Sequence, residues 1–502
     1  MSNQACLLRS QAPAVRSLAV IVETASGRVR GTSGDDGVTV FKGIPHGAAA
    51  RFAPPQPAPA WTGVREALEF GPQAPQVPGF LEQAFGLADW PMSEDCLSLN
   101  VWTPAAGQPD ARLPVLVWIH GGAFTNGTGA VPWYDGTAFA RHGCVLVTIN
   151  YRLGALGFTH LADLDGERFA GSGNLGLLDQ VAALRWVHDS IASFGGDPRR
   201  VTIFGESAGG ASVASLLTCP AATGLFAGAI AQSPAFLQLR SRDDATVAAE
   251  KLLAELDARA TDLLDMPLDR LLAAQQSAFA GPELFTAFAP TPDGTVLPGP
   301  VIDGLAGGDS AATPLVLGTN RDELYLFTAL DGRAASLDDA GLAAVAERHA
   351  RGDPAALVAT YAAARPGRTP GQLATSIAGD DGFWRPTLEV ATARAALGAP
   401  TWLYRFDWAT PTFGGLLGAC HGVEIPFVFH SLHVPSAEVF LGDGADRPAI
   451  ADAVHGAWAR FAAFGDPGWP RYDLERRPTM RFDVTSEVVP DLDGELRLCW
   501  VP

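Results

Sequence analysis

The stretch Val201-Thr-Ile-Phe-Gly-Glu-Ser-Ala-Gly-Gly210 is the strongest indication of fold in this chain. Four β-prone residues lead into Gly205-Glu206-Ser207-Ala208-Gly209, and small residues then continue as a predicted helix. A strand that turns at once into a helix strains its central residue and leaves room only for small neighbours. The pattern therefore predicts a serine hydroxyl held clear of the backbone, beside a helix N-terminus that favours negative charge. Such five-residue patterns also occur in ordinary loops, so the surrounding sequence has to decide.

The composition is that of a folded, acidic protein. The chain has 502 residues, of which 47% are hydrophobic and 18% are charged, as in globular domains. The 35 Lys and Arg residues against 54 Asp and Glu residues give a net charge of −19. Nucleic acid is not an expected partner, because it is bound by clustered basic residues. No stretch approaches the ~18 apolar residues of a membrane span, so no membrane association is expected.

The cysteines and the N-terminus favour a cytoplasmic protein without a metal site. The apolar run from Leu18 to Val22 is too short for the core of a signal peptide. The cysteines show neither a C-x-x-C pair nor a zinc-binding spacing, and their density is ordinary for a reduced protein. They lie at Cys6, Cys96, Cys144, Cys219, Cys420 and Cys499.

The core of the chain alternates predicted buried strands with predicted helices. The clearest helix runs from Leu177 to Phe194 and is ended by Gly195-Gly196. The strands are short continuous apolar runs, which are expected where helices cover both faces of a sheet. This order predicts an α/β fold with a mostly parallel, doubly wound sheet. The strand candidates are residues 114–120, 144–149, 201–204, 227–231, 314–317 and 401–406.

We expect a single domain over residues 18–498 that follows an N-terminal tail, residues 1–17. Two Ala/Leu-rich segments, near residues 240–285 and 331–398, are predicted helical insertions between sheet strands. We expect these insertions to form a cap over the site.

A nucleophilic serine needs nearby donors for the oxyanion and a base that accepts its proton. The segment His120-Gly-Gly-Ala-Phe124 directly follows a predicted strand and matches the HGGG-type loop of esterases except for its last glycine. Gly121 and Gly122 would present unobstructed backbone N–H groups, and the N–H of Ala208 would complete the oxyanion hole.

Five histidines follow Ser207 and are candidate bases: His349, His421, His430, His433 and His455. We expect His455 on the surface of a predicted helix and His349 in a solvated, charged helical stretch. His421 instead lies in the glycine-rich loop 414–422 after the last predicted strand. In α/β hydrolases the triad follows the order serine, acid, histidine, and each member follows a strand. This placement favours His421 over the two histidines that come next.

The candidate acids are Asp322 and Glu323, which follow the predicted strand at residues 314–317. A carboxylate at that position would orient an imidazole and stabilise its cation. Either residue would also suit the first turn of the predicted helix at residues 324–329. Spacing alone leaves the choice open.

Together these motifs resemble the type-B carboxylesterase family, the cholinesterase-like branch of the α/β hydrolases. Two signatures carry most of the resemblance: Glu94-Asp-Cys-Leu-Ser-Leu-Asn-Val-Trp102 and Phe204-Gly-Glu-Ser-Ala-Gly-Gly210. No cysteine lies between Cys6 and Cys96, so the chain is similar to bacterial para-nitrobenzyl esterases that lack disulfides. Further matching stretches are Phe41-Lys-Gly-Ile-Pro45, Asn150-Tyr-Arg-Leu-Gly-Ala-Leu-Gly-Phe158 and Gly173-Asn-Leu-Gly-Leu-Leu-Asp-Gln180.

The resemblance implies roles for individual residues. It implies a triad of Ser207, His421 and Glu323, with the histidine in the matching segment Cys420-His-Gly-Val-Glu-Ile-Pro-Phe-Val-Phe429. It also implies an oxyanion hole formed by Gly121, Gly122 and Ala208. Two ion pairs that brace the scaffold are implied as well, Arg51 with Glu94 and Arg152 with Asp179.

The expected activity is hydrolysis of neutral carboxylic esters with short acyl or aryl groups, without a metal or organic cofactor. Glu206 and Ser233 are candidates for supporting the site from behind. The same triad acting on amides, thioesters, lactones or carbamates is an alternative. A non-catalytic cholinesterase-like binding protein is less favoured, because all three triad positions are filled. Oligomeric state and the physiological ester stay open. The expected apolar pocket residues are Phe85, Phe124, Phe285 and Phe288.

Overall fold

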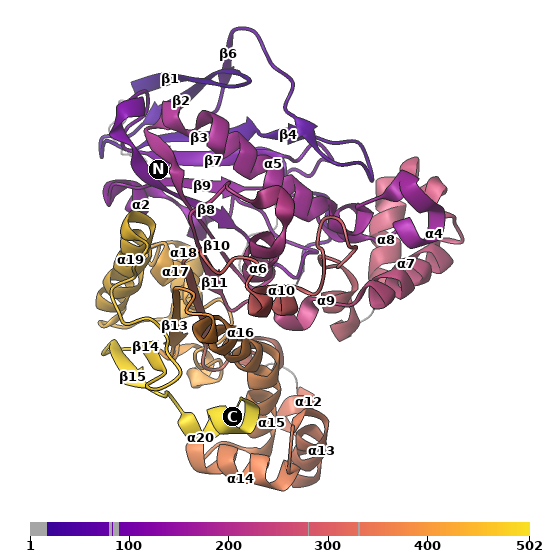
Figure 1. Cartoon of the computed structure of the whole chain (residues 1–502), viewed down its shortest axis with the longest axis vertical. Coiled ribbons are helices and arrows are strands. Elements are labelled where there is room, and N and C mark those ends of the chain that lie inside the picture. The colour runs from indigo at the N-terminus through magenta and orange to yellow at the C-terminus, as the bar shows by residue number, and fades with distance from the viewer. Residues whose placement is uncertain (1–17, 80–82, 84–89, 280, 330–331, 502) are drawn as a thin grey trace, which may run out of the picture.

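A computed structural model describes residues 18–79, 83, 90–279, 281–329 and 332–501. Figure 1 shows one long, twisted sheet with helices on both sides and two helical groups that project from it. Within the described ranges the main sheet has 13 strands, in the order β1-β2-β3-β7-β9-β8-β10-β11-β12-β13-β14-β15, with β6 beside β2. The run from β9 to β14 is parallel throughout. The predicted α/β fold with a mostly parallel sheet is therefore confirmed.

All six predicted strands are present, and five of them begin and end within three residues of the predicted positions. The strand predicted at residues 201–204 begins five residues earlier, at Gly196. The N-terminal part consists of β1 (Leu18–Thr24), β2 (Gly27–Ser33), β3 (Thr39–Pro45), β6 (Val64–Glu66) and β7 (Ser98–Thr103). Its strands pair antiparallel, except that β6 pairs parallel with β2. The parallel strands are β8 (Leu113–Ile119), β9 (Val145–Ile149), β10 (Gly196–Glu206), β11 (Gly228–Gln232), β12 (Leu315–Asn320), β13 (Thr401–Phe406) and β14 (Pro478–Phe482). The edge strand β15 (Glu487–Pro490) is antiparallel, and β4 (Gly47–Ala48) pairs with β5 (Gln56–Pro57) in a separate small sheet.

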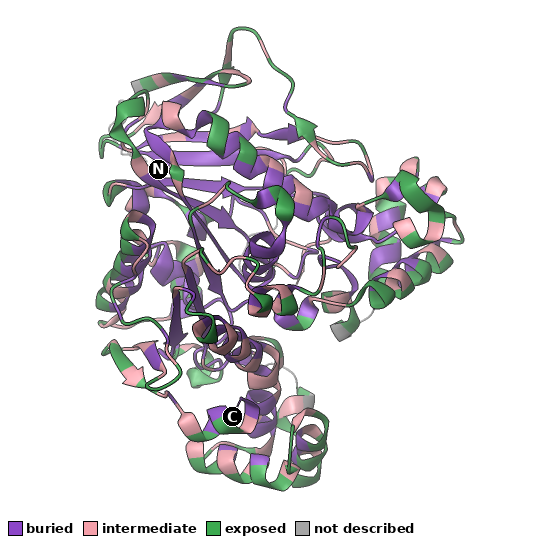
Figure 2. Ribbon diagram, viewed as in Figure 1, coloured by how far each residue is buried: buried purple, intermediate pink, exposed green. Residues whose placement is uncertain are grey.

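Both faces of the central strands are buried, as Figure 2 shows. Along β8, Val115, Val117 and Ile119 belong to one hydrophobic cluster. The alternating residues Leu116 and Trp118 belong to a second cluster on the opposite face. Successive side chains of a strand point to opposite faces, so a strand covered on both sides is a continuous apolar run.

Helices cover each face of the sheet. The first hydrophobic cluster is covered by α5 (Leu175–Ser190), α6 (Ala208–Thr218), α10 (Val301–Gly307) and α16 (Arg385–Ala396). The second is covered by α2 (Thr137–Arg141), α17 (Ile425–Val428), α18 (Pro435–Leu441) and α19 (Arg447–Phe464). Short helices α3 (Gly154–Phe158) and α4 (Ala162–Asp165) precede α5. The helix predicted over Leu177–Phe194 is thus present as α5, followed by a 3₁₀ turn at Ile191–Phe194.

The two predicted insertions form the projecting helical groups of Figure 1. Between β11 and β12 the chain forms α7 (Arg242–Leu256), α8 (Leu268–Ala278) and α9 (Leu284–Ala287). Between β12 and β13 it forms α11 (Tyr325–Thr328), α12 (Gly332–Ala335), α13 (Asp339–His349), α14 (Pro354–Ala364) and α15 (Pro370–Gly379), then a π-helical turn at Asp380–Trp384. The C-terminal helix α20 (Gly494–Trp500) packs on α14. A role for these helices as a cap stays a prediction.

The expectation that His455 lies on a helix surface was wrong. His455 is buried, with 1% of its surface exposed, and its Nδ1 donates to Val428 O at 2.8 Å. It lies on the side of α19 that faces α17, and the amphipathic pattern alone did not place it there. His349 is partly buried and contacts Asp381 Oδ2 through Nδ1 at 2.9 Å. The acid comes from the π-helical turn, which is distant in sequence.

Candidate active site

Ser207 lies at a sharp turn between β10 and α6. Its backbone angles are φ 60° and ψ −121°, a strained conformation for a residue with a side chain. A Cβ atom on Gly205 would lie 2.6 Å from Ile119 O, and one on Gly209 would overlap the same oxygen. The turn therefore requires glycine on both sides of the serine, because β8 packs directly against it.

Glu323 and His421 meet beside this turn, although they are 98 residues apart in sequence. His421 Nδ1 lies 2.6 Å from Glu323 Oε2. The other carboxylate oxygen, Oε1, accepts the backbone N–H of Asn320 at 2.7 Å. Because Asn320 is the last residue of β12, the strand end fixes the carboxylate, and the carboxylate in turn fixes the tautomer and orientation of the imidazole.

Asp322 points elsewhere. Its Oδ2 pairs with Arg321 Nη2 at 2.8 Å and accepts the N–H of Ala419 at 2.9 Å. Arg368 Nη2 lies 3.4 Å from the second oxygen, Oδ1. Asp322 therefore holds the loop before His421 against the end of β12. Of the two candidate acids, Glu323 is the one in contact with the imidazole.

The other ring nitrogen of His421 faces a second carboxylate. His421 Nε2 lies 3.0 Å from Glu206 Oε1, and no hydrogen bond between described residues joins Nε2 to the hydroxyl of Ser207. Burial raises the pKa of Glu206 to about 8, and its other acidic neighbours add to this rise while the His421 cation opposes it. Burial alone lowers the pKa of His421, but Glu206 and Glu323 outweigh it and raise that pKa to about 9. The structure thus holds a histidine between two carboxylates.

Glu424 adds a third buried carboxylate, which the sequence analysis did not single out. It is fully buried and accepts hydrogen bonds from Asn320 Nδ2 at 2.6 Å and from Gln232 Nε2 at 3.0 Å. Burial is the main cause of its raised pKa. Glu424 stands three residues after His421, inside the motif that carries the histidine. This position could have indicated that it belongs to the site.

Ser233 lies directly behind the nucleophile. It has a positive φ of 40°, and its N–H donates to Gly318 O at 2.8 Å. The preceding residue, Gln232, accepts the N–H of Ser207 at 3.0 Å. The hydroxyl of Ser233 is buried and has no hydrogen-bond partner among the described residues. Ser233 therefore belongs to the turn after β11 whose backbone is hydrogen-bonded to Ser207.

Backbone donors gather on the remaining side of Ser207. A Cβ atom on Gly121 would lie 3.1 Å from Ser207 Cβ, so the glycine backbone approaches the serine closely. Gly122 has a φ of 109°, which strongly favours glycine. Ala208 is the first residue of α6. Over the described residues, no backbone acceptor binds the N–H groups of Gly121, Gly122 or Ala208, which leaves them available to a negatively charged oxygen.

Aromatic rings surround the imidazole of His421. Phe383 and Phe327 lie 5.0 and 5.6 Å from it, centroid to centroid. Phe285, a predicted pocket residue, lies 5.8 Å from Phe327 and is 43% exposed. The sequence analysis missed Phe327 and Phe383. Phe327 follows Glu323 by one helical turn, and this spacing could have indicated that it lies near the site. Phe383 is brought there by the π-helical turn, which has no recognisable sequence pattern.

The other predicted pocket residues are placed differently. Phe124 is fully buried and packs edge-on against Phe158 at 4.9 Å. Phe288 packs against Phe279 at 5.3 Å. Phe85 lies outside the described residues. Their part in a substrate pocket stays a prediction.

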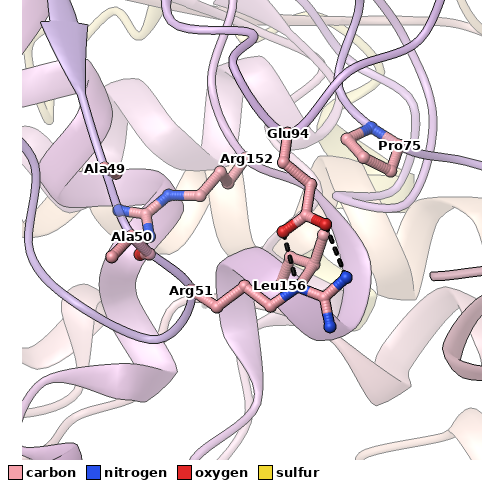
Figure 3. A pocket seen from close by; sticks show the side chains of 7 residues that line it. All are labelled: Ala49, Ala50, Arg51, Pro75, Glu94, Arg152 and Leu156. Carbon is pink, nitrogen blue, oxygen red and sulfur yellow. Dashed lines mark hydrogen bonds and ion pairs between the residues drawn. The ribbon is translucent and has the colours of Figure 1, made fainter. Parts of the chain in front are cut away.

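Two ion pairs brace the loops around the site. In Figure 3, Arg51 and Glu94 face each other, and two hydrogen bonds of 2.6 and 2.5 Å join them. Arg152 also lines the pocket drawn in Figure 3. The volume of this pocket is about 10 Å³, at the limit of what one water molecule needs. Arg152 forms a buried, bidentate pair with Asp179 at 2.8 and 2.7 Å. Both pairs implied by the resemblance are present.

Two kinds of feature are absent from the described ranges. No group of three or more His, Cys, Asp or Glu side chains there is arranged to hold a metal ion. None of the helices there combines the length and apolar character that a bilayer crossing requires.

Comparison with known proteins identifies the family. Residues 19–491 match the model of the carboxylesterase family. The chain is 38% identical to the para-nitrobenzyl esterase of Bacillus subtilis, over 95% of this chain and 97% of the relative. It is 35% identical to the phenmedipham hydrolase of Pseudarthrobacter oxydans, over 94% and 95%. A crystal structure of a Geobacillus stearothermophilus carboxylesterase superposes with a TM-score of 0.86 at 43% identity, over 96% of this chain and all of that one. The chain therefore belongs to the carboxylesterase family and is a serine ester hydrolase with the α/β-hydrolase fold.

Proposed function

We propose that Ser207, His421 and Glu323 form the catalytic triad that hydrolyses the ester. The observation that carries this proposal is the 2.6 Å contact between His421 Nδ1 and Glu323 Oε2 beside the strained turn at Ser207. In this mechanism Ser207 Oγ attacks the ester carbonyl, and His421 Nε2 takes the hydroxyl proton and passes it to the leaving alcohol. Water then attacks the acyl-enzyme by the same route and releases the carboxylic acid.

The backbone N–H groups of Gly121, Gly122 and Ala208 stabilise the oxyanion in this proposal. Their support is the close approach of the Gly121 backbone to Ser207 and the position of Ala208 at the start of α6. Preorganised donors of this kind act where negative charge develops, and loss of one costs about 10² to 10³ in kcat. For Nε2 to serve as the base, it has to turn from Glu206 toward Ser207. Catalytic hydrogen bonds often tighten only when substrate binds.

Neutral esters with short acyl or aryl groups are the proposed substrates. The similarity to a para-nitrobenzyl esterase supports this class, and so do the apolar rings of Phe285, Phe327 and Phe383 next to the imidazole. Another relative of comparable identity is named as a phenmedipham hydrolase. The names of the relatives therefore do not agree on one substrate. Amides, thioesters, lactones and carbamates are the alternative substrates of the same triad. A cytoplasmic, bacterial location stays a prediction.

Replacing Ser207 with alanine tests the triad. We expect kcat for 4-nitrophenyl acetate to fall by roughly 10⁴ to 10⁶, as in other serine hydrolases, and labelling by a fluorophosphonate to disappear. Ser215→Ala is the matched control, because Ser215 lies on α6 and its hydroxyl donates to Ala211 O within that helix. Near-normal turnover by Ser207→Ala would sink the assignment. A panel of 4-nitrophenyl esters, anilides and thioesters then separates the possible substrate classes.

A further inference from the structure

A second cavity lies on the face of the sheet covered by α2 and α17, and none of the proposed catalytic residues lines it. Its volume is about 380 Å³, within the range of roughly 300–1,000 Å³ that small-molecule sites occupy. One wall comes from the segment that leads into and forms α2. The other comes from the turn after α17. The lining residues are Asp135, Thr137, Ala138, Arg141, Phe429, His430, Ser431 and His433.

Ser431, one of the lining residues, carries a buried hydroxyl without a partner among the described residues. Ser431 is 1% exposed, and its Oγ has no hydrogen-bond partner among the described residues. Its backbone groups are engaged, since the N–H donates to Pro426 O and the carbonyl accepts from Val434. Leaving a buried polar group without a partner is unfavourable. The unpaired hydroxyl therefore marks a position where a ligand atom would complete a hydrogen bond.

Further donors line the same cavity. Arg141 uses one guanidinium nitrogen to bind Asp36 at 2.9 Å, and its side chain is 59% exposed. A guanidinium has five N–H donors, so most of them remain available. The rings of His430 and His433 add two more ionisable groups, of which His430 contacts Asp452 through Nε2 at 2.9 Å.

Three acids lie in or beside the cavity, and two of them contact basic side chains. Asp135 is the single carboxylate in the lining, and its Oδ1 accepts the N–H of Thr137 at 2.9 Å. Asp36 and Asp452 are outside the lining and face Arg141 and His430. The apolar residues of the lining are Phe429, which is 1% exposed, and Ala138. The site therefore offers an apolar surface next to donors that suit an anion.

We propose that this cavity binds small carboxylates with an aromatic or short aliphatic body. The carboxylate would accept from Arg141 and the Ser431 hydroxyl, in the charge-assisted geometry that guanidinium groups favour, while the body lies against Phe429. Acids of this class are released by ester hydrolysis, so the product of the enzyme is a natural occupant.

The cavity is linked through Phe429 to the strands that carry the active site. The ring of Phe429 lies 5.0 Å from Trp118 and 5.7 Å from Phe204. Trp118 is on β8, just before the glycine loop, and Phe204 is on β10, three residues before Ser207. Close-packed interiors transmit small shifts of side chains. A ligand in the cavity would therefore change the turnover of substrate at the active site as well as the binding of substrate there.

Benzoate binding by isothermal titration calorimetry tests the site. The active site is first blocked by labelling the enzyme with a fluorophosphonate. We expect the labelled wild type to bind one benzoate per chain, Arg141→Gln to bind it at least tenfold more weakly, and neutral benzamide to bind far more weakly than benzoate. Arg199→Gln is the matched control, because it removes the same charge from a side chain that is 77% exposed and outside the lining. Absence of saturable binding, or equal binding by the two arginine variants, would overturn the proposal.

Two further measurements separate binding from a structural effect. Ser431→Ala should keep or raise the thermal midpoint, since the hydroxyl has no protein partner to lose, and should still weaken benzoate binding. In the unlabelled wild type, benzoate should act as a mixed inhibitor of 4-nitrophenyl acetate hydrolysis, whereas in Arg141→Gln its inhibition should be purely competitive. Purely competitive inhibition of the wild type, or undiminished benzoate binding by Ser431→Ala, would contradict the assignment.

Discussion

Glu206→Gln changes the charge next to the proposed general base while keeping the shape of the side chain. In the wild type, Glu206 Oε1 lies 3.0 Å from His421 Nε2, the nitrogen that has to accept the proton of Ser207. Together with Glu323, this carboxylate raises the pKa of His421 to about 9 against the opposing effect of burial. Glutamine cannot carry the negative charge. The substitution therefore removes one of the two groups that stabilise the imidazolium.

The direction in which the pH profile shifts depends on the protonation state of His421 that is active in catalysis. His421 accepts a proton only when neutral, so a raised pKa moves the acidic limb of the pH profile to higher pH. The raised pKa keeps most of the imidazole protonated at neutral pH. An adjacent opposite charge shifts a pKa by about 1–3 units. We therefore expect Glu206→Gln to move the limb down by at least one unit, with about a tenfold gain in the neutral fraction at pH 7 per unit.

The assay is kcat/KM for 4-nitrophenyl acetate across pH 5 to 10, corrected for spontaneous hydrolysis. Because Glu206 and His421 interact strongly, the wild-type limb belongs to the pair and not to either group. Glu389→Gln is the control, since it makes the same chemical change in a partly exposed side chain that pairs with Arg385 on α16. A limb that stays in place or moves to higher pH in Glu206→Gln would refute the reasoning.

Three further substitutions test other parts of the structure. Glu323→Gln should lower kcat by roughly 10⁴, as loss of the orienting acid does in other triads; a drop below tenfold in steady-state kinetics argues against Glu323. Asp179→Asn leaves the buried cation of Arg152 without its partner and should lower the free energy of unfolding in urea by about 3–5 kcal/mol, so an unchanged midpoint contradicts that role. Gly209→Ala places a methyl group against Ile119 O and should cost about 1–3 kcal/mol or more of stability together with activity. Wild-type turnover and melting temperature would show that the turn tolerates a side chain.

The location of the nucleophile and of the main strands was predictable because it depends on local rules. Buried strands such as β8 and β12 are continuous apolar runs when helices cover both faces. The glycines around Ser207 are required by the close approach of Ile119 O. Both constraints act within a few residues of chain, so they leave a recognisable pattern in the sequence.

Contacts between distant segments were less predictable. Sequence spacing puts both Asp322 and Glu323 at the end of β12, so it does not show which of them contacts the imidazole. The directions of the two side chains in the structure decide this. Glu323 points to His421, whereas Asp322 is held by Arg321 and the N–H of Ala419. The direction of a side chain at a strand end depends on which segments pack beside it, and these are about 100 residues away in sequence.

The burial of His455 has the same origin. An amphipathic pattern shows that a helix has one apolar face, but the edge of that face depends on what packs against it. Here α17 lies beside α19 and offers Val428 O to the imidazole. A polar residue near the boundary is thereby buried with its hydrogen bond satisfied.

The sequence alone determined the α/β architecture, the nucleophile motif, the glycine loop and the order of the catalytic candidates along the chain. These features arise from side-chain size, backbone sterics and hydrophobic period, which act locally. Tertiary structure decided which carboxylate contacts the imidazole, and it brought Glu206 to within 3.0 Å of His421 Nε2. It also placed Phe327 and Phe383 around that ring and formed the cavity that Phe429 helps to line. These contacts depend on how separate elements pack on the sheet, so short-range sequence patterns do not contain them.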